Sequence, residues 1–245
     1  DFDSLAGLLN ATGKFTAIAA TAAERDALRG ISFGGNRLKV STDVTYVGTN
    51  ITTRRTPLRV LQDSRVASAV QCALRIASAR TPAAIAALAV GSACIPKMLF
   101  GAFWTPPSAS RLKALRAKVL GAQWGTCRRM RCPEVVIGVF NEPTRTDPFG
   151  ALIYRGLTDA RRLLRACEDR RNRFIALIPL VDEFDLDNLQ GPVHAFLAYL
   201  KALECKYEIV GNDVCVSWCE DASRFVHLLD DDPSLFRAFV RRRVA

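Results

Sequence analysis

Four residues near the C-terminal end have the chemistry and the order of a metal site. Cys215 is followed by Cys219 after three residues, by His227 after seven more, and by Asp232 after a further four. Thiolates and imidazoles are common ligands of structural zinc, and a carboxylate is an acceptable but uncommon one. Cys205 could replace the aspartate. The simpler interpretation is two half-buried thiols and a surface histidine, so the sequence predicts no bound zinc.

Positive charge is the second feature with a chemical consequence. Residues 1–180 hold 27 Lys and Arg against 12 Asp and Glu, a net +15, whereas residues 181–245 hold 7 against 12, a net −5. Within 50–131 there are 14 basic residues and one acid, Asp63. Such a stretch on helices is typical of contact with a polyanion. The alternative is a solvated basic face, and we favour nucleic acid because so few acids interrupt the stretch.

The composition is that of a folded protein. Of 245 residues, 49% are hydrophobic and 24% are charged, which allows one or two domains with a substantial core. The 8 cysteines are scattered, and a core of this size needs no disulfide framework, so we expect reduced thiols in an intracellular protein. The chain starts at Asp1, partway through an apparent helix and without a signal peptide, which suggests a fragment of a longer protein.

Short strand and turn signals make up the first 50 residues. Thr21 and Glu24 have capping-box spacing, which predicts a helix over 22–29. The Gly-Gly-Asn turn at 34–36 predicts a hairpin over 31–40. Further strands are expected at 15–20 and 44–47.

The pattern changes to helix after residue 56. Apolar residues recur every three to five positions over 58–77, which predicts an amphipathic helix. The apolar run 83–95 has 13 residues before Pro96 breaks it. A bilayer span needs about 20, so we expect a buried helix and no membrane contact.

Helical signals continue to the C terminus. A basic helix is expected over 109–123, and Asp147 and Pro148 fit the cap and first position of a helix that reaches about Arg173. The tail, 192–245, is expected to be helical with one strand at 207–210. Strands followed by helices argue an α+β fold. The helix after Pro148 is expected to expose Arg155, Arg161, Arg162, Arg165, Arg170 and Arg171.

The motifs of the first 50 residues follow one another in a distinctive order. The order is Gly7-Leu8, Asn10, Lys14, the hairpin at Gly34-Gly35, and Tyr46-Val47-Gly48. This order resembles the end of the palm in a non-LTR-retrotransposon reverse transcriptase, just after the catalytic aspartates. Asn10 stands one place early, and Val47 replaces the usual Leu.

The following residues resemble the thumb of that family. Pro96 to Gly101 resembles its Pro-Lys-x-Leu-x-Gly turn, and Leu112 to Gly125, Arg128 to Cys132 and Asp147-Pro148 resemble elements from protists. The likeness covers residues 3–175. It implies a hairpin-containing palm remnant at 1–50 and a mainly helical thumb at 51–180. An acidic helical tail of unknown role would follow at 181–245, with the boundary in the acidic connector 182–187.

The resemblance also implies roles for individual residues. Lys14 would neutralise or protonate the departing pyrophosphate, and Tyr46 and Gly48 would form the primer grip. A set of cations would hold the sugar-phosphate backbone of an RNA–DNA hybrid. The alternatives are a surface lysine, an ordinary turn and solubilising charges. Trp104 and Trp124 could be platforms on which bases stack, but a position in the core is expected for both. The set is Arg54, Arg55, Arg59, Arg111, Lys113, Arg116, Lys118, Arg128, Arg129 and Arg131.

The implied function is that of an RNA-directed DNA polymerase, intracellular and nuclear, with RNA and RNA–DNA hybrid as partners. Such a polymerase holds Mg²⁺ with palm aspartates. Asp1 and Asp3 are not adjacent and lie too close to Gly7 to be the aspartate turn. We therefore expect this fragment to bind no Mg²⁺ and to be inactive alone. The alternatives are a non-catalytic basic helical module that binds nucleic acid, or a degenerate, inactive element remnant.

Overall fold

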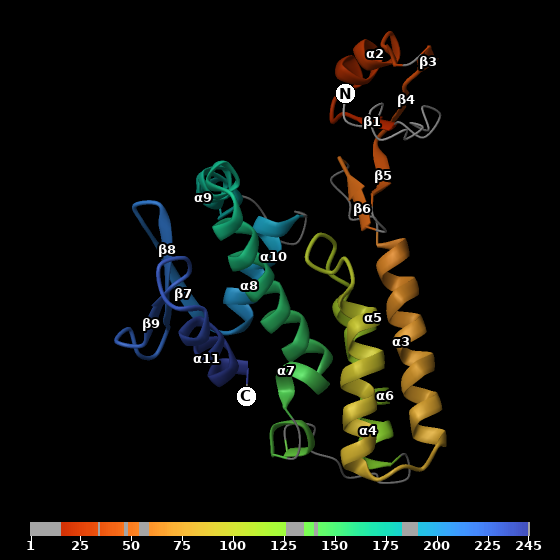
Figure 1. Cartoon of the computed structure of the whole chain (residues 1–245), viewed down its shortest axis with the longest axis vertical. Helices are drawn as coiled ribbons and strands as arrows, with labels where there is room; N and C mark the ends of the chain where they lie inside the picture. Colours follow the sequence, from red (N-terminus) through yellow and green to blue (C-terminus); the bar gives the residue numbers. More distant parts are fainter. Residues whose placement is uncertain are drawn as a thin grey trace, which may run out of the picture.

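In the part of the chain that it describes, a computed structural model mixes helices with four small sheets (Figure 1). The α+β class is therefore confirmed at this level. The structure describes residues 16–33, 35–46, 49–53, 59–125, 135–139, 142–182 and 191–244.

The described N-terminal residues, from 16 to 53, form short strands and one helix. The capping box forms as expected, since the Thr21 amide donates to Glu24 Oε2 (3.0 Å) and the Glu24 amide donates to Thr21 Oγ1 (3.2 Å). β1 pairs with β4 in parallel, whereas β2 with β3 and β5 with β6 form antiparallel hairpins. The elements are β1 (Thr16–Ile18), α2 (Ala22–Arg29), β2 (Ser32–Phe33), β3 (Asn36–Arg37), β4 (Lys39–Ser41), β5 (Asp43–Tyr46) and β6 (Thr49–Thr52).

A bundle of upright helices follows (Figure 1). α3 packs along α6, with α5 and the π-helical turn η2 also against α3. The sequence predicted a break at Pro96, but the helix does not end there. A π turn precedes Pro96, and the helix continues to Leu99, because a π turn shifts the backbone pairing that a proline would otherwise break. The elements are α3 (Val60–Ser78), α4 (Ala83–Ala89), η2 (Val90–Cys94), α5 (Ile95–Leu99) and α6 (Ala109–Trp124).

The apolar run is also less buried than expected. Ala86, Ala87 and Val90 are buried, but Ile85 is 54% and Leu88 is 72% exposed. No described helix combines the length and the apolar character that crossing a bilayer demands.

α8 lies between the helical bundle and the C-terminal part. It packs against α5 and α6 of the bundle and against α10 and α11 of the C-terminal part. Asp147 caps it as predicted, accepting from the Phe149 amide at 3.4 Å, and Pro148 takes the first position. The helix ends at Ala166, short of the expected Arg173, because Cys167 is extended (φ −154°, ψ 117°). The elements are η3 (Val135–Val139), α7 (Pro143–Thr146), α8 (Pro148–Ala166), α9 (Glu168–Asp182) and α10 (Pro192–Ala202).

The tail was predicted to be helical with one strand, and this is wrong for its middle part, because helices form only its two ends. The tail contains an antiparallel sheet, β7-β8-β9, rather than a single strand. Val210 pairs with Asp213, so Gly211 and Asn212 form the two-residue loop, and Gly211 has the positive φ (60°) that such loops require. The elements are β7 (Cys205–Val210), β8 (Asp213–Trp218), β9 (Phe225–His227) and α11 (Pro233–Val244).

One large buried cluster joins the helical bundle to the tail. It includes Val66 and Leu115 from the bundle, Leu157 from α8, and Phe196 and Val214 from the C-terminal part. The cluster thus has members on both sides of the boundary expected at 182–187. The division into domains remains a prediction, and most of that connector lies outside the described residues.

Candidate nucleic-acid interface

More than half of the predicted site residues cannot be placed. Lys14, Gly48, Arg54, Arg55, Arg128, Arg129 and Arg131 lie outside the described residues. Tyr46 is the last residue of β5, where its backbone pairs with Thr49 of β6. The hairpin that the resemblance assigns to the primer grip is therefore described only in its strands.

Four predicted cations lie on α6, and they differ in their surroundings. Arg111, Lys113 and Lys118 are exposed, whereas Arg116 is half-buried. Arg111 and Lys118, seven residues apart, share one side of the helix, and Lys113 borders the opposite edge of the buried stripe. Arg59, which precedes α3, is half-buried.

Arg116 is engaged within the protein. Its Nε lies 3.0 Å from Oδ1 of Asp147, the cap of α8. Burial raises the pKa of the Asp147 carboxyl, and the Arg116 guanidinium acts against that rise. Arg116 therefore ties α6 to the start of α8, and of the four cations on α6 it is the least suited to contact a phosphate.

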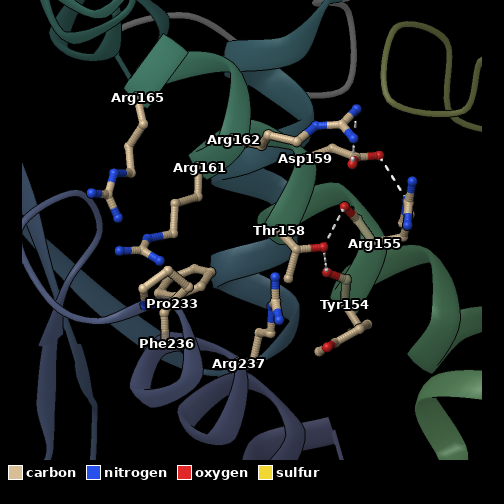
Figure 2. Close-up of a pocket in the computed structure, with 10 residues that line it drawn as sticks. All are labelled: Tyr154, Arg155, Thr158, Asp159, Arg161, Arg162, Arg165, Pro233, Phe236 and Arg237. Atoms are coloured by element: carbon tan, nitrogen blue, oxygen red, sulfur yellow. Dashed lines mark hydrogen bonds and ion pairs between the residues drawn. The ribbon is translucent and has the colours of Figure 1, made fainter.

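A pocket lined by arginines, here called the arginine pocket, opens between α8 and α11. Asp159 pairs with two of the arginines, its carboxylate lying 3.0 Å from Arg155 Nε and 3.8 Å from Arg162 Nη2. Figure 2 shows these two guanidiniums on either side of Asp159, while Arg237 rises from α11 toward Thr158. The pocket has a volume of about 350 Å³. Its lining residues are Tyr154, Arg155, Thr158, Asp159, Arg161, Arg162, Arg165, Pro233, Phe236 and Arg237.

Arg161, which the sequence placed on an exposed face, is only 4% exposed. Its guanidinium donates to the backbone carbonyls of Leu228, Leu229 (3.3 Å) and Asp231. Hydrophobic periodicity alone could not reveal this, because the partners lie 67 to 70 residues further along the chain. Arg162 and Arg165 are exposed, as expected.

Two further hollows continue from the arginine pocket. The first, of about 480 Å³, shares Asp159 and Arg162 with it and is lined by β6 and by the turn after α5. The second, of about 660 Å³, shares Phe103, Trp104 and Leu163 with the first and extends along α9. We call the two together the aromatic trench. Its main lining residues are Phe100, Phe103, Trp104, Arg162, Leu163 and Arg170.

The exposed aromatic rings of the trench were missed by the sequence analysis. Phe100 is 55% exposed and Trp104 is 46% exposed, so the expectation of a core position for Trp104 was wrong. Trp124 is half-buried against Leu120 and Val136, closer to the expectation. Gly101 was a usable signal, because a glycine after an apolar run is typical of a helix end, and it stands between Phe100 and Trp104.

The turn that carries the rings is held from two sides. Arg65 Nη1 donates to the Phe100 carbonyl at 2.9 Å, and its guanidinium lies 4.6 Å from the centre of the Phe100 ring. Thr105 Oγ1 donates to the Asn50 carbonyl of β6 at 3.0 Å. Gly101 has φ +75°, and a Cβ there would come within 2.8 Å of Arg65. The backbone turn that carries Phe100 and Trp104 is thus held in place by hydrogen bonds to α3 and β6.

Metal ligands are not gathered in the part of the chain that the structure describes. No group of three or more His, Cys, Asp or Glu side chains there is arranged to hold a metal ion. Cys215 stands opposite His227 in the β8–β9 ladder. The absence of zinc remains a prediction, and elemental analysis of the purified protein would check it.

The chain was compared with protein-family models, with curated proteins and with solved structures, and nothing matches it. Its role must therefore be inferred from its own residues. The described residues offer two surfaces for a polyanion: the exposed cations of α6, and the arginine pocket with the aromatic trench beside it.

Proposed function

We propose that this chain holds the RNA–DNA template–primer duplex as part of a non-LTR-retrotransposon reverse transcriptase. The observation that carries the proposal is the charge of the helical bundle. Residues 59–125 hold nine basic side chains and one acid, Asp63. Cations that contact phosphates position a duplex without reading its sequence, and the shape of a hybrid duplex is close to A-form.

The order of the elements supports the polymerase context. Small hairpins come first, and the β5–β6 hairpin leads into α3 of the bundle. The resemblance places a palm end and a thumb in that order. Polymerisation itself is assigned to the full-length protein, because Asp1 and Asp3 are not adjacent and lie too close to Gly7 to be the aspartate turn of that family. Nuclear location belongs to the same proposal.

A non-catalytic module that binds nucleic acid is the second candidate. The same charged bundle favours it, because phosphate contacts need no catalytic group. The two candidates differ in the sequence upstream of Asp1. A Tyr/Phe-x-Asp-Asp turn shortly before that residue in the full-length protein would support the polymerase, and its absence would favour the module.

Fluorescence anisotropy with two labelled RNA–DNA hybrids of unrelated sequence tests the proposal. Both hybrids should bind with similar affinity, and log affinity should fall with log salt by roughly 0.7–0.9 for each phosphate contact. Replacing Arg111 and Lys118 together by Gln should weaken binding to both hybrids and flatten the slope. The matched control replaces Lys201 and Lys206, two exposed lysines of the acidic C-terminal part, by Gln.

Two results would count against this role. One is an affinity that does not depend on salt, and the other is an equal loss of binding in the control variant. Primer extension with Mg²⁺ by this chain alone, above background, would show that the catalytic assignment is wrong.

A further inference from the structure

We propose that the aromatic trench binds an unpaired nucleic-acid strand, with bases stacked on Trp104 and Phe100 and phosphates held by Arg162 and Arg170. The site is separate from the α6 cations, and its assignment rests on the nucleic-acid role proposed above. The protein would then bind two forms of nucleic acid, an unpaired strand at the trench and a duplex at the α6 cations.

The rings are suited to stacking because they are exposed and held in place. Phe103 packs edge to face against Trp104, with ring centres 5.9 Å apart and an interplanar angle of 76°. The turn that carries them is anchored to α3 through Arg65 and to β6 through the Thr105 hydroxyl. A base could therefore stack without the cost of ordering a mobile side chain.

The charge along the trench favours a polyanion. Arg162 lies at its junction with the arginine pocket, and Arg170 lies at the α9 end. Among the described residues, the side chain of Arg170 has no hydrogen-bond or ion-pair partner, and neither do those of Arg165 and Arg237 in the arginine pocket, although Arg165 acts electrostatically on Asp232. Asp159 is the only acid among the trench-lining residues and is shared between two arginines. A strand would thus meet cations on both sides of the rings.

An unpaired strand fits these features better than a duplex does. In a duplex the faces of the bases are stacked on one another, so exposed aromatic rings on a protein have nothing to stack against. Single strands display those faces, and proteins hold them with aromatic platforms beside a basic groove. An acidic peptide would satisfy the arginines but would gain no base stacking from the rings.

The test compares a labelled oligothymidylate, an oligouridylate and an RNA–DNA hybrid of the same length, bound by the 245-residue chain. Trp104→Ala should weaken single-strand binding by about 5- to 150-fold, the range expected when one base stack is removed, and should leave hybrid binding unchanged. Trp104→Phe should keep most of the affinity. Phe225→Ala, which removes an aromatic ring that is 56% exposed on β9, is the matched control and should change neither.

The cations are tested by salt dependence. Arg162→Gln combined with Arg170→Gln should weaken single-strand binding and lower the slope by roughly 0.7 for each phosphate that no longer meets a cation. If circular dichroism shows that Trp104→Ala is unfolded, the double arginine variant still tests whether the trench binds a single strand.

Several outcomes would overturn the inference. They are unchanged single-strand binding in folded Trp104→Ala, an equal loss for strand and hybrid, an unaltered slope in the arginine variant, or competition by polyglutamate as strong as by oligothymidylate. If the wild-type chain binds hybrid and one of these outcomes is found, only the assignment of the aromatic trench to an unpaired strand is wrong. If it binds neither strand nor hybrid, the proposed function itself fails.

Discussion

Gly156 of α8 lies directly against the ring of Tyr199 on α10. A Cβ on Gly156 would come within 2.2 Å of Tyr199 Cε2 and 2.7 Å of Cδ2. Tyr199 is buried, so its ring has little room to move away. The absence of a side chain at position 156 is therefore what lets the two helices approach each other.

Gly156→Ala should destabilise the protein by about 1–3 kcal/mol, because the added methyl group overfills a packed core. Urea denaturation followed by circular dichroism measures the change. Gly30→Ala is the control, since Gly30 has an ordinary φ of −74° and a Cβ there would meet its nearest atom at 3.4 Å. A Gly156→Ala variant as stable as the wild type would mean that α8 and α10 are further apart than described.

The sequence predicted the helix starts that depend on residues close by in the chain. The Thr21 and Glu24 capping box sets the start of α2, and the Asp147 cap with Pro148 sets the start of α8. In both, the decisive hydrogen bonds or backbone restrictions lie within three residues along the chain, so the sequence contains all the necessary information.

Features that depend on distant partners were not predicted. The aromatic trench forms where β6, the turn at Phe100 to Trp104 and α8 meet, and Arg161 is buried by a loop in the tail. The β7–β8 hairpin is a different case. Gly211-Asn212 is a recognisable two-residue turn signal between alternating apolar residues, and giving it more weight than the helical pattern would have identified the sheet.

Arg161 and Asp213 both bind the loop that follows β9, Arg161 through its carbonyls and Asp213 through its amides. Arg161 donates to the carbonyls of Leu228 and Leu229, while the Asp213 carboxylate accepts from the amides of Leu229 (3.0 Å) and Asp230 (3.1 Å). The loop joins the sheet to α11, so the Arg161 contacts attach the C-terminal part to α8, and the Asp213 contacts attach the loop to β8.

Arg161→Met should therefore destabilise the protein by about 1–3 kcal/mol, because the carbonyls lose their donor inside the protein. Arg165→Met, one helical turn away and exposed, should change the free energy of unfolding by no more than about 0.5 kcal/mol. Chemical denaturation of both variants measures the difference. Equal effects would show that the Arg161 contacts contribute no more than an exposed arginine does.

Two buried cysteines should resist alkylation in the folded protein. Burial raises the pKa of Cys94 to about 12, with a smaller effect from Cys72, and burial raises the pKa of Cys205 to about 11. The thiolate is the reactive form, so at pH 8 both should react with iodoacetamide at least about 100-fold more slowly than in urea. Of the six cysteines that the structure describes, exposed Cys219 should be labelled first. Peptide mapping over time gives the order, and early labelling of Cys94 in folded protein would contradict the burial described.

The basic segment Arg128, Arg129 and Arg131 lies outside the described residues, but its charge supports a prediction about hybrid binding. Replacing all three by Gln should weaken binding to hybrids of unrelated sequence to a similar degree, because phosphate contacts do not read bases.

The salt slope of that variant should flatten by roughly 0.7–0.9 for each phosphate that the replaced arginines would have neutralised, since fewer counterions are released on binding. Stability should change by no more than about 0.5 kcal/mol if the three side chains are exposed, and thermal denaturation checks this. The control replaces three exposed cations of the C-terminal part, Lys201, Lys206 and Arg242, by Gln. If the slope stays intact in the triple variant or falls equally in the control, the hybrid lies on another surface, and the charge of the 50–131 stretch serves solubility.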